Sequence, residues 1–356
     1  MRTQQDHDGP ADTPPRRRRR LGLYLPFLIL ALLAVGWSVV WFVIRDRTRA
    51  GLDEWIAAEA VSGRRWSCAD RSFSGYPFRI EIGCSDFTVD RPDVHASIGR
   101  LLVVSQLYQP RHIIAEASGP LRVAAGSTRV EGDWRLLQAS VILREGGFDR
   151  ISLVVDAPTA SIINPGATTL DVASRRFEGH LRPDPAVPTT FDLALRSDGA
   201  VIPGLEILVG GQEPADLQIG IGVTESDDLP ARPLWGELER WRLANGRVEL
   251  RSLSMTKGPR RAQATGSFGI DSEHRPQGQL QMSAIGLGGL LGRVAGGSGI
   301  GGALLGALLG TPEPDAAPAG TGAAPGLKRL PPLRLDGGRL YVGPLPIPGI
   351  RIPPLY

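Results

Sequence analysis

The feature that most constrains this chain is an uninterrupted apolar stretch near its N-terminus. Residues 21–44 contain no charged side chain. As a helix rising about 1.5 Å per residue they would span about 36 Å, enough to cross a hydrocarbon core of about 30 Å. Five consecutive arginines, Arg16–Arg20, precede the stretch, and basic residues beside a span stay on the cytoplasmic side. The sequence therefore predicts one transmembrane helix that sends the rest of the chain across the membrane.

A cleaved export signal would also begin with a basic region. Such signals have an apolar core of only about 7–15 residues, followed by a small-x-small cleavage site. Here the apolar stretch is longer, and the bulky Trp37 and Trp41 stand near its end. A twin-arginine signal is a further alternative, but the residues around the arginines fit it poorly. We interpret residues 21–44 as an uncleaved anchor and residues 1–20 as a basic cytoplasmic tail.

Beyond the anchor, the apolar residues follow the pattern of β-strands. Apolar and polar side chains alternate over residues 78–84, 151–155, 191–195 and 217–223, which is typical of strands that bury one face in an antiparallel sheet. The 45 glycines and 30 prolines favour many turns. Since no strand–helix–strand rhythm appears, we expect a mostly β fold of about fourteen to eighteen strands. They would form an elongated, curled antiparallel sheet, either an open groove or a sandwich.

Two short segments predict β-hairpins. Residues 241–250 contain two strand-like runs joined by Asn245-Gly246, and an Asn-Gly pair supplies the positive φ angles of a type I′ turn. The glycines of Asp336-Gly337-Gly338 join residues 333–335 to residues 339–342 in a similar way. We expect both segments to be antiparallel hairpins.

The spacing of apolar residues also indicates how the chain is organised. Leu52, Trp55, Ile56 and Ala60 share one helical face, and Gly63 can end that helix. The predicted segments are a basic tail (1–20), a transmembrane helix (21–44), a juxtamembrane helix (45–65), a β domain (66–283), a Gly/Ala/Pro-rich insertion (284–326) and a C-terminal hairpin and tail that complete the β domain (327–356).

The insertion begins with an apolar, glycine-rich stretch, residues 284–310, whose only charge is Arg293. It is long enough to cross a membrane, but glycine is a poor helix former. A second span would also return the C-terminal hairpin to the cytoplasm, away from the sheet. We favour a flexible or partly helical insertion; a helix that touches lipid and a second span are the alternatives.

The two cysteines, Cys68 and Cys84, allow two interpretations. In the cytosol they would be unrelated thiols, whereas across a membrane, in an oxidising compartment, they would form one local disulfide. A metal site fits less well, because no histidine lies nearby at ligand spacing.

No arrangement of residues in the sequence predicts catalysis. The five histidines are scattered, so spacing supports neither a Ser-His-Asp triad nor a metal cluster. Gly297, Gly299 and Gly302 match G-x-G-x-x-G, but no strand precedes them, and we interpret the match as chance. A basic stripe with interleaved aromatics, which nucleic-acid binding requires, is missing. We therefore expect a non-enzymatic protein with no cofactor, metal or nucleic-acid partner.

An antiparallel sheet with one apolar face needs a cover, which can be another sheet, a helix or a lipid. Phe78, Ile80 and Ile82 follow one another on one face of a predicted strand. They are the candidates for an apolar groove, in which each buried CH₂ of an acyl chain contributes about 0.8 kcal/mol. The alternative is that they are core residues of a closed domain.

Three stretches after the anchor carry a family resemblance. They are Trp66 with Cys68, residues 74–84 (SGYPFRIEIGC), and residues 336–346 (DGGRLYVGPLP) leading to the closing PPLY of residues 353–356. Together they resemble an uncharacterised family of alphaproteobacterial envelope proteins, domain of unknown function 2125, over essentially the whole chain. The Gly-Tyr-Pro-Phe-Arg segment is also similar to the start of AsmA-like proteins, in which an N-terminal membrane helix runs into a twisted β groove.

The resemblance implies a role in lipid handling or envelope assembly and supplies no catalytic residues. The chain is much shorter than the long lipid-bridging members of the AsmA-like group. We expect a single-pass inner-membrane protein with a cytoplasmic N-terminus and a periplasmic main domain. Its partners would be inner-membrane lipid and a bound phospholipid or another apolar envelope component. The alternative is a membrane-tethered scaffold that recruits an envelope protein through exposed sheet edges.

Overall fold

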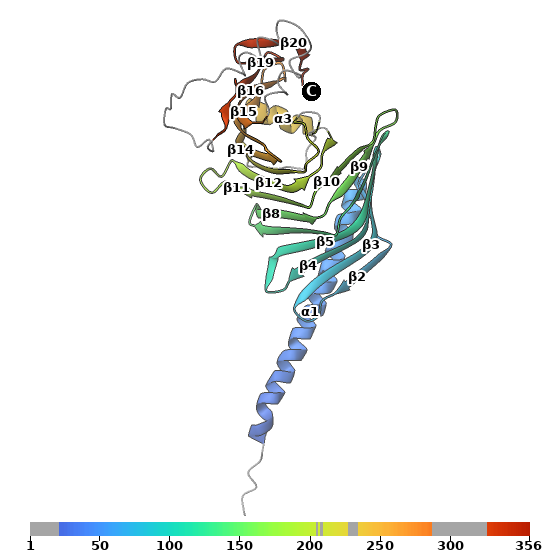
Figure 1. The fold of residues 1–356 in the computed structure, drawn as a ribbon. Coiled ribbons are helices and arrows are strands. Elements are labelled where there is room, and N and C mark those ends of the chain that lie inside the picture. The colour runs from blue at the N-terminus through green and yellow to red at the C-terminus, as the bar shows by residue number, and fades with distance from the viewer. Residues whose placement is uncertain (1–20, 204–205, 207–208, 227–233, 287–325) are drawn as a thin grey trace, which may run out of the picture. The chain divides into compact units, whose positions relative to one another are not determined.

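The computed structural model describes residues 21–203, 206, 209–226, 234–286 and 326–356 (Figure 1). The predicted cytoplasmic tail, the G-x-G-x-x-G segment and residues 287–325 of the predicted insertion lie outside the described residues. The chain divides into two compact units, Met1–Leu52 and Asp53–Tyr356.

The N-terminal apolar stretch lies in a single long helix, α1 (Leu21–Val61). Within the described residues, this is the one helix long and apolar enough to cross a membrane. Residues 45–61 of the predicted juxtamembrane segment (45–65) are helical, and they continue α1 without a break. Residues 45–61 contain no proline, so nothing in them interrupts the backbone hydrogen bonds. The helix ends just before Gly63, whose φ is 79°, as predicted.

The rest of the described chain is dominated by one large antiparallel sheet that is not closed. It contains twenty described strands, more than expected, because short strands such as β1 and β17 carry no alternation that sequence analysis can detect. The strands before the middle of the chain are β1 (Arg65–Ser67), β2 (Asp70–Ser74), β3 (Arg79–Arg91), β4 (Val94–Gln106), β5 (Gln109–Ala125), β6 (Thr128–Asp133), β7 (Leu136–Arg144), β8 (Gly147–Asp156), β9 (Thr159–Ile163) and β10 (Leu170–Ala173). Those after it are β11 (Arg176–Pro183), β12 (Phe191–Ala200), β13 (Ala215–Val223), β14 (Val248–Lys257), β15 (Arg260–Ile270), β16 (Pro276–Ile285), β17 (Lys328–Arg329), β18 (Leu333–Asp336), β19 (Arg339–Val342) and β20 (Leu345–Arg351).

The sheet forks at its longest strand, β5. The first half of β5 pairs with β7, and the second half pairs with β6. From β7 the main sheet continues through β8, β11, β12, β13, β14, β15 and β16. From β6 a short branch runs through β9 to β10, and Ala173 of β10 bridges back to Val201 next to β12. The fork therefore brings the branch back toward the main sheet.

A closed core lies at one end of the main sheet. Its buried members are Val209, Met255, Ala262 and Ala284, with Leu217 and Leu330 packed against them. They come from β13 to β16 and from the segments that precede β13 and β18. Figure 1 shows the sheet curling at this end, where α3 (Leu234–Leu243) leads into β14.

The two predicted hairpins had different outcomes. The hairpin at Asp336-Gly337-Gly338 is confirmed as β18 and β19, with Gly337 and Gly338 at positive φ. The hairpin over residues 241–250 was wrong, because its first half lies in α3. Two pairs at i,i+3 spacing, Glu237–Arg240 and Glu239–Arg242, favour the helix.

The Asn-Gly pair caps α3 instead of turning a hairpin. Asn245 takes a φ of 60°, the left-handed geometry of a helix C-cap, and the N–H of Gly246 donates to the carbonyl of Trp241. Gly246 lies against the indole of Trp241, where an added Cβ would come within 2.2 Å of Nε1. The same Nε1–H donates to the carbonyl of Thr224 at 2.6 Å. This hydrogen bond holds the indole over Gly246, and the absence of a side chain at Gly246 leaves the indole room to pack there.

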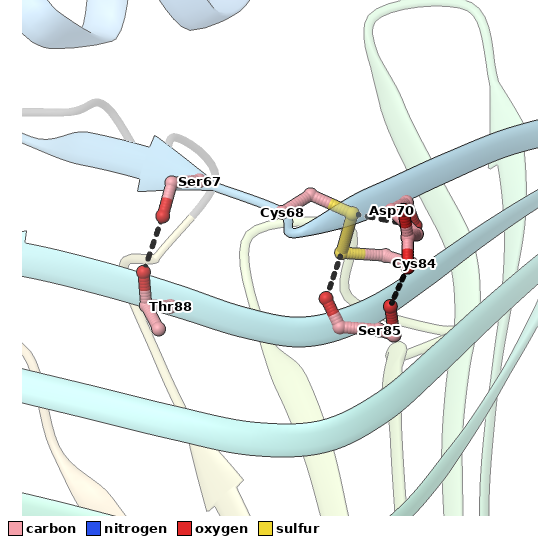
Figure 2. Close-up of a disulfide and its surroundings, with 6 residues drawn as sticks. All are labelled: Ser67, Cys68, Asp70, Cys84, Ser85 and Thr88. Carbon is pink, nitrogen blue, oxygen red and sulfur yellow. Dashed lines mark hydrogen bonds between the residues drawn. A yellow bond between two sulfur atoms is a disulfide. The ribbon is translucent and has the colours of Figure 1, made fainter.

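Cys68 and Cys84 are joined by a disulfide, so the interpretation as free thiols was wrong (Figure 2). The bond links the connection between β1 and β2 to the middle of β3. Beside it, the hydroxyls of Ser67 and Thr88 hydrogen-bond where β1 pairs with β3. The disulfide therefore fixes the short edge strands β1 and β2 to the first long strand.

An aromatic cluster ties the end of α1 to the same strands within the second unit. The ring of Trp66 on β1 lies 5.0 Å from that of Trp55 on α1 and 5.6 Å from that of Phe87 on β3. Trp66 Nε1–H and the guanidinium of Arg64 both donate to the carboxylate of Glu59. The last turns of α1 are thus packed onto the beginning of the sheet.

We predict that Gly246→Ala lowers the free energy of unfolding by about 2 kcal/mol, because the new methyl group displaces Trp241 from its packed position. The matched control is Gly236→Ala in α3, where an added Cβ meets nothing within 4 Å. The control should stabilise the protein by up to about 1 kcal/mol through helix propensity. Urea unfolding followed by circular dichroism measures both, and equal effects would contradict the proposed role of Gly246.

We also predict that replacing both cysteines with serine lowers the free energy of unfolding by about 3 kcal/mol, the chain-entropy value for a loop of this length. A reductant should destabilise the unmodified protein by a similar amount and leave the double variant unchanged. Urea unfolding with and without reductant tests this. A reductant effect that persists in the variant would show that the destabilisation has another origin.

Candidate binding surface

The register of the sheet lines up apolar side chains across its strands. Starting from Ile80 on β3 and moving from partner to partner, the first row reaches Val342 on β19. Its members are Ile80, Ser105, Ile113, Val141, Ile151, Leu181, Leu193, Ile221, Leu250, Gly266, Leu280, Leu333 and Val342. Directly opposed residues of neighbouring strands point to the same side of a sheet, so these side chains share one face.

Two further rows lie beside the first, because side chains two residues apart on a strand share a face. The second row is Ile82, Val103, Ala115, Ala139, Leu153, Gly179, Leu195, Ile219, Leu253, Ala264 and Met282, and the third is Cys84, Leu101, Ala117, Leu137, Val155, Phe177, Ser197, Leu217, Met255, Ala262 and Ala284. We call the three rows together the apolar face.

The apolar face is sealed at its ends and incompletely covered between them. Ile80 is only 7% exposed, and the far ends of the second and third rows lie in or beside the closed core. Between β4 and β13, every member of the first two rows is half-buried, none fully. A closed sandwich would bury such residues completely. The middle of the face therefore offers apolar surface that the described protein itself does not cover.

A hollow of about 240 Å³ adjoins the third row where the branch returns to the main sheet. Val155 and Phe177 of that row line it, together with Ala160 and Val172 from the branch and Ile202 from the segment after β12. Polar side chains contribute little to its surface. The fork of the sheet thus creates apolar space next to the apolar face.

The opposite face of the same strands carries more polar and charged side chains, although Leu102, Val104, Ile114 and Val154 also lie on it. We call it the polar face. A shallow hollow of about 490 Å³ is lined by charged and polar side chains of this face, and Leu181, Leu193 and Ile221 of the first row also contribute to its lining; its charged members are Arg150, Arg182, Asp192 and Arg251. Arg251 forms ion pairs with both Asp184 and Asp192. The backbone N–H of Ala186, followed by the Arg251 guanidinium, lowers the pKa of Asp184. Burying these charged side chains under an apolar ligand would be costly. The apolar face is therefore the better candidate for binding an uncharged ligand.

The structure separates the three candidate groove residues. Ile80 and Ile82 head the first and second rows of the apolar face, whereas Phe78 precedes β3 in a turn and is 60% exposed. Ile80 is buried at the end of its row, and Ile82 is half-buried. A ligand-binding role for these residues stays a prediction, and the half-buried residues farther along the rows are stronger candidates.

The sequence pattern did not indicate that those residues, among them Leu195 and Ile219, form part of a binding surface. Alternation identified the faces of β12 and β13 separately. Which face of one strand continues which face of the next depends on register, and a shift of one residue would reverse it. The repeated alternation was the signal, but it needed the pairing of strands to become a surface.

A polar cluster that the sequence did not indicate holds the C-terminus against α3. The hydroxyl of Tyr356 donates to Oε2 of Glu239 at 2.8 Å, and the guanidinium of Arg242 donates to both oxygens of the same carboxylate. His274 lies 3.3 Å from that carboxylate, with its ring 4.5 Å from the ring of Tyr356. The backbone N–H of Leu355 donates to the carbonyl of His274. We call Glu239, Arg242, His274 and Tyr356 the C-terminal clasp.

The clasp perturbs the acidity of its members. The hydrogen bonds from Arg242, followed by that from Tyr356, lower the pKa of Glu239 from its ordinary 4.5 to about 2. Burial, followed by the hydrogen bond to Glu239, raises the pKa of Tyr356. The closing Pro-Pro-Leu-Tyr thus has a structural task, which is to fasten the last residues to α3 and to the turn between β15 and β16.

Residues 41–350 match the sequence model of a family described as an uncharacterized protein conserved in bacteria (DUF2125). No curated protein and no solved structure matches the chain. The match covers both the apolar face and α3. The further similarity to AsmA-like proteins stays a prediction.

We predict that Glu239→Gln destabilises the protein in a pH-dependent way. A carboxyl whose pKa is lowered by folding contributes stability that is fully present above its unfolded value, near 4.5, and is lost as the pH falls to about 2. The decrease in the free energy of unfolding caused by the substitution should therefore be largest at pH 5 and above, and it should become smaller at lower pH. Urea unfolding at several pH values measures it, with Glu145→Gln as control because the Glu145 side chain is 93% exposed. A loss independent of pH would contradict the assignment.

Proposed function

The chain belongs to the bacterial family DUF2125, and from that premise we propose that it is a membrane-anchored, non-enzymatic protein whose apolar face binds lipid or another apolar component of the cell envelope. The main support for this proposal is the incompletely covered middle of the apolar face, where the residues of the first two rows are half-buried from β4 to β13. An acyl chain laid along these rows would gain about 0.8 kcal/mol for each CH₂ removed from water.

The proposal places α1 in the inner membrane and the sheet in the periplasm. Two features support this orientation. Arg16–Arg20 precede the apolar stretch, which favours a cytoplasmic N-terminus. The disulfide between Cys68 and Cys84 follows the stretch, and disulfides persist in oxidising compartments.

The absence of catalysis is part of the proposal. The His180 imidazole hydrogen-bonds the Ser152 hydroxyl through Nδ1 at 3.0 Å on the polar face. Among the residues that the structure describes, no carboxylate hydrogen-bonds to either side chain in the way that a catalytic triad requires. Within the described ranges, no three His, Cys, Asp or Glu side chains are grouped to hold a metal ion. The proposal therefore assigns no catalytic residue.

The second candidate function is a scaffold that recruits a protein partner through a sheet edge. It draws on β2 and β20, which pair on one side only within the described residues, because an extended peptide can add to such an edge. Crosslinking in cells distinguishes the two functions. A scaffold yields a discrete protein adduct, whereas a lipid binder needs none.

We predict that the double variant Leu195→Gln, Ile219→Gln loses most of its bound lipid, because two amides would be buried under an acyl chain without hydrogen-bond partners. The matched control is Ala194→Gln, which adds the same side chain to the polar face of the same strand, where Ala194 is exposed. The full-length proteins are extracted from membranes without harsh detergent, and lipid per protein is measured by native mass spectrometry. The proposal would be contradicted if the unmodified protein carried no lipid, or if the double variant and the control carried equal amounts of lipid per protein.

A further inference from the structure

Three aromatic side chains stand exposed at one rim of the sheet. Tyr76 (54% exposed) and Phe78 (60%) belong to the turn between β2 and β3, and Tyr108 (67%) belongs to the turn between β4 and β5. The two turns are neighbours, because the backbone N–H of Leu107 donates to the carbonyl of Phe78 at 3.0 Å. We call these three residues the aromatic rim.

Exposed apolar side chains continue along the same ends of the strands. Leu143, next to the turn between β7 and β8, and Val187, between β11 and β12, are both exposed. The opposite ends of β3, β4 and β5 differ, since their turns consist of Pro92-Asp93 and Gly126-Ser127. Single exposed apolar residues are common, but a series of them along one rim indicates a surface that contacts another apolar phase.

The composition of the rim suits a lipid bilayer. Tyrosine and other aromatic rings concentrate at the membrane–water interface, where an apolar ring meets a polar layer. Exposed arginines accompany them: Arg79, which pairs with Glu81, follows Phe78, and Arg111, which pairs with Glu145 at 3.5 Å, lies three residues after Tyr108. Arginine side chains form bidentate hydrogen bonds with phosphate oxygens, which the headgroup layer supplies.

With α1 anchored as proposed, the chain tethers the second unit close to a bilayer. The charge-free stretch of α1 ends at Ile44, and the second unit starts at Asp53 in the same helix. Residues 45–52 extend about 12 Å as a helix. A unit held by so short a tether cannot leave the membrane surface, so a bilayer is the apolar phase always available to it.

We propose that the aromatic rim enters the headgroup layer of the membrane that holds α1, and that lipid passes there onto the apolar face. Ile80, the first member of the first row, follows Phe78 by two residues, so the rim adjoins the start of the row. The lipid-passage part rests on the proposed lipid binding, whereas membrane contact by the rim rests only on the proposed anchoring of α1 in a membrane.

Membrane contact is tested with a nitroxide spin label on the full-length chain in phospholipid nanodiscs. Cys68 and Cys84 are joined and do not react, so Tyr108→Cys provides a single labelling site, and Asp93→Cys provides the control on the opposite rim. The label at residue 108 should be more accessible to oxygen than to a water-soluble nickel complex, and the label at residue 93 should show the reverse. Aqueous behaviour at both positions would overturn the membrane contact.

Lipid passage is tested with a triple variant in which Tyr76, Phe78 and Tyr108 become serine. Full-length protein is mixed with vesicles that contain a phospholipid with a photoreactive acyl chain, and crosslinks to peptides of β12 and β13 are followed with time. The triple variant should acquire crosslinks several-fold more slowly than the unmodified protein, with an unchanged urea midpoint. Equal rates would overturn the passage. If the unmodified protein acquires no crosslinks while the label at residue 108 lies in the membrane, the proposed lipid binding is wrong and the membrane contact stands.

Discussion

The hydrogen-bonded register of the main sheet is the constraint on which the other features of this protein depend. From β3 to β16 each strand meets the next so that apolar residues oppose apolar residues, and the three rows of the apolar face stay in phase. A shift of one residue in any strand would turn its apolar side chains to the polar face, among the ion pairs of Asp184, Asp192 and Arg251. The cost of burying those charges against apolar neighbours fixes the pairing.

The ends of this sheet are held by local interactions. At β3, the disulfide and the cluster of Trp55, Trp66 and Phe87 fasten the edge strands and the last turns of α1. On β13 to β16, the closed core holds one end of the strands, and the C-terminal clasp joins Tyr356 to α3 and to His274 in the turn between β15 and β16. With both ends secured, the middle of the apolar face keeps its shape without a complete core beneath it, which allows a surface to stay partly uncovered in a folded protein.

The combination of a membrane helix and a partly uncovered apolar face unites the proposals for function. A soluble protein that exposed such a face would risk association through it. In the proposed arrangement, α1 anchors the protein in a bilayer, and a bilayer is a phase that can supply apolar molecules to cover the face. Dispersion and hydrophobic burial need no specific hydrogen bonds. This fits a face whose rows consist mostly of aliphatic side chains and alanine.

The sequence by itself determined the elements whose signal is local. The charge-free stretch of residues 21–44 predicted a span, alternation identified β3, β8, β12 and β13, and Asp336-Gly337-Gly338 predicted the hairpin of β18 and β19. The tertiary structure decided what depends on distant residues. Asn245-Gly246 caps a helix because Trp241 packs over it, and Tyr356 matters because Glu239 lies beside it. Leu195 and Ile219 form one surface because of pairing that neither strand encodes alone. Local patterns fix a strand and its two faces, whereas register and closure are set by the free energy of all the strands together.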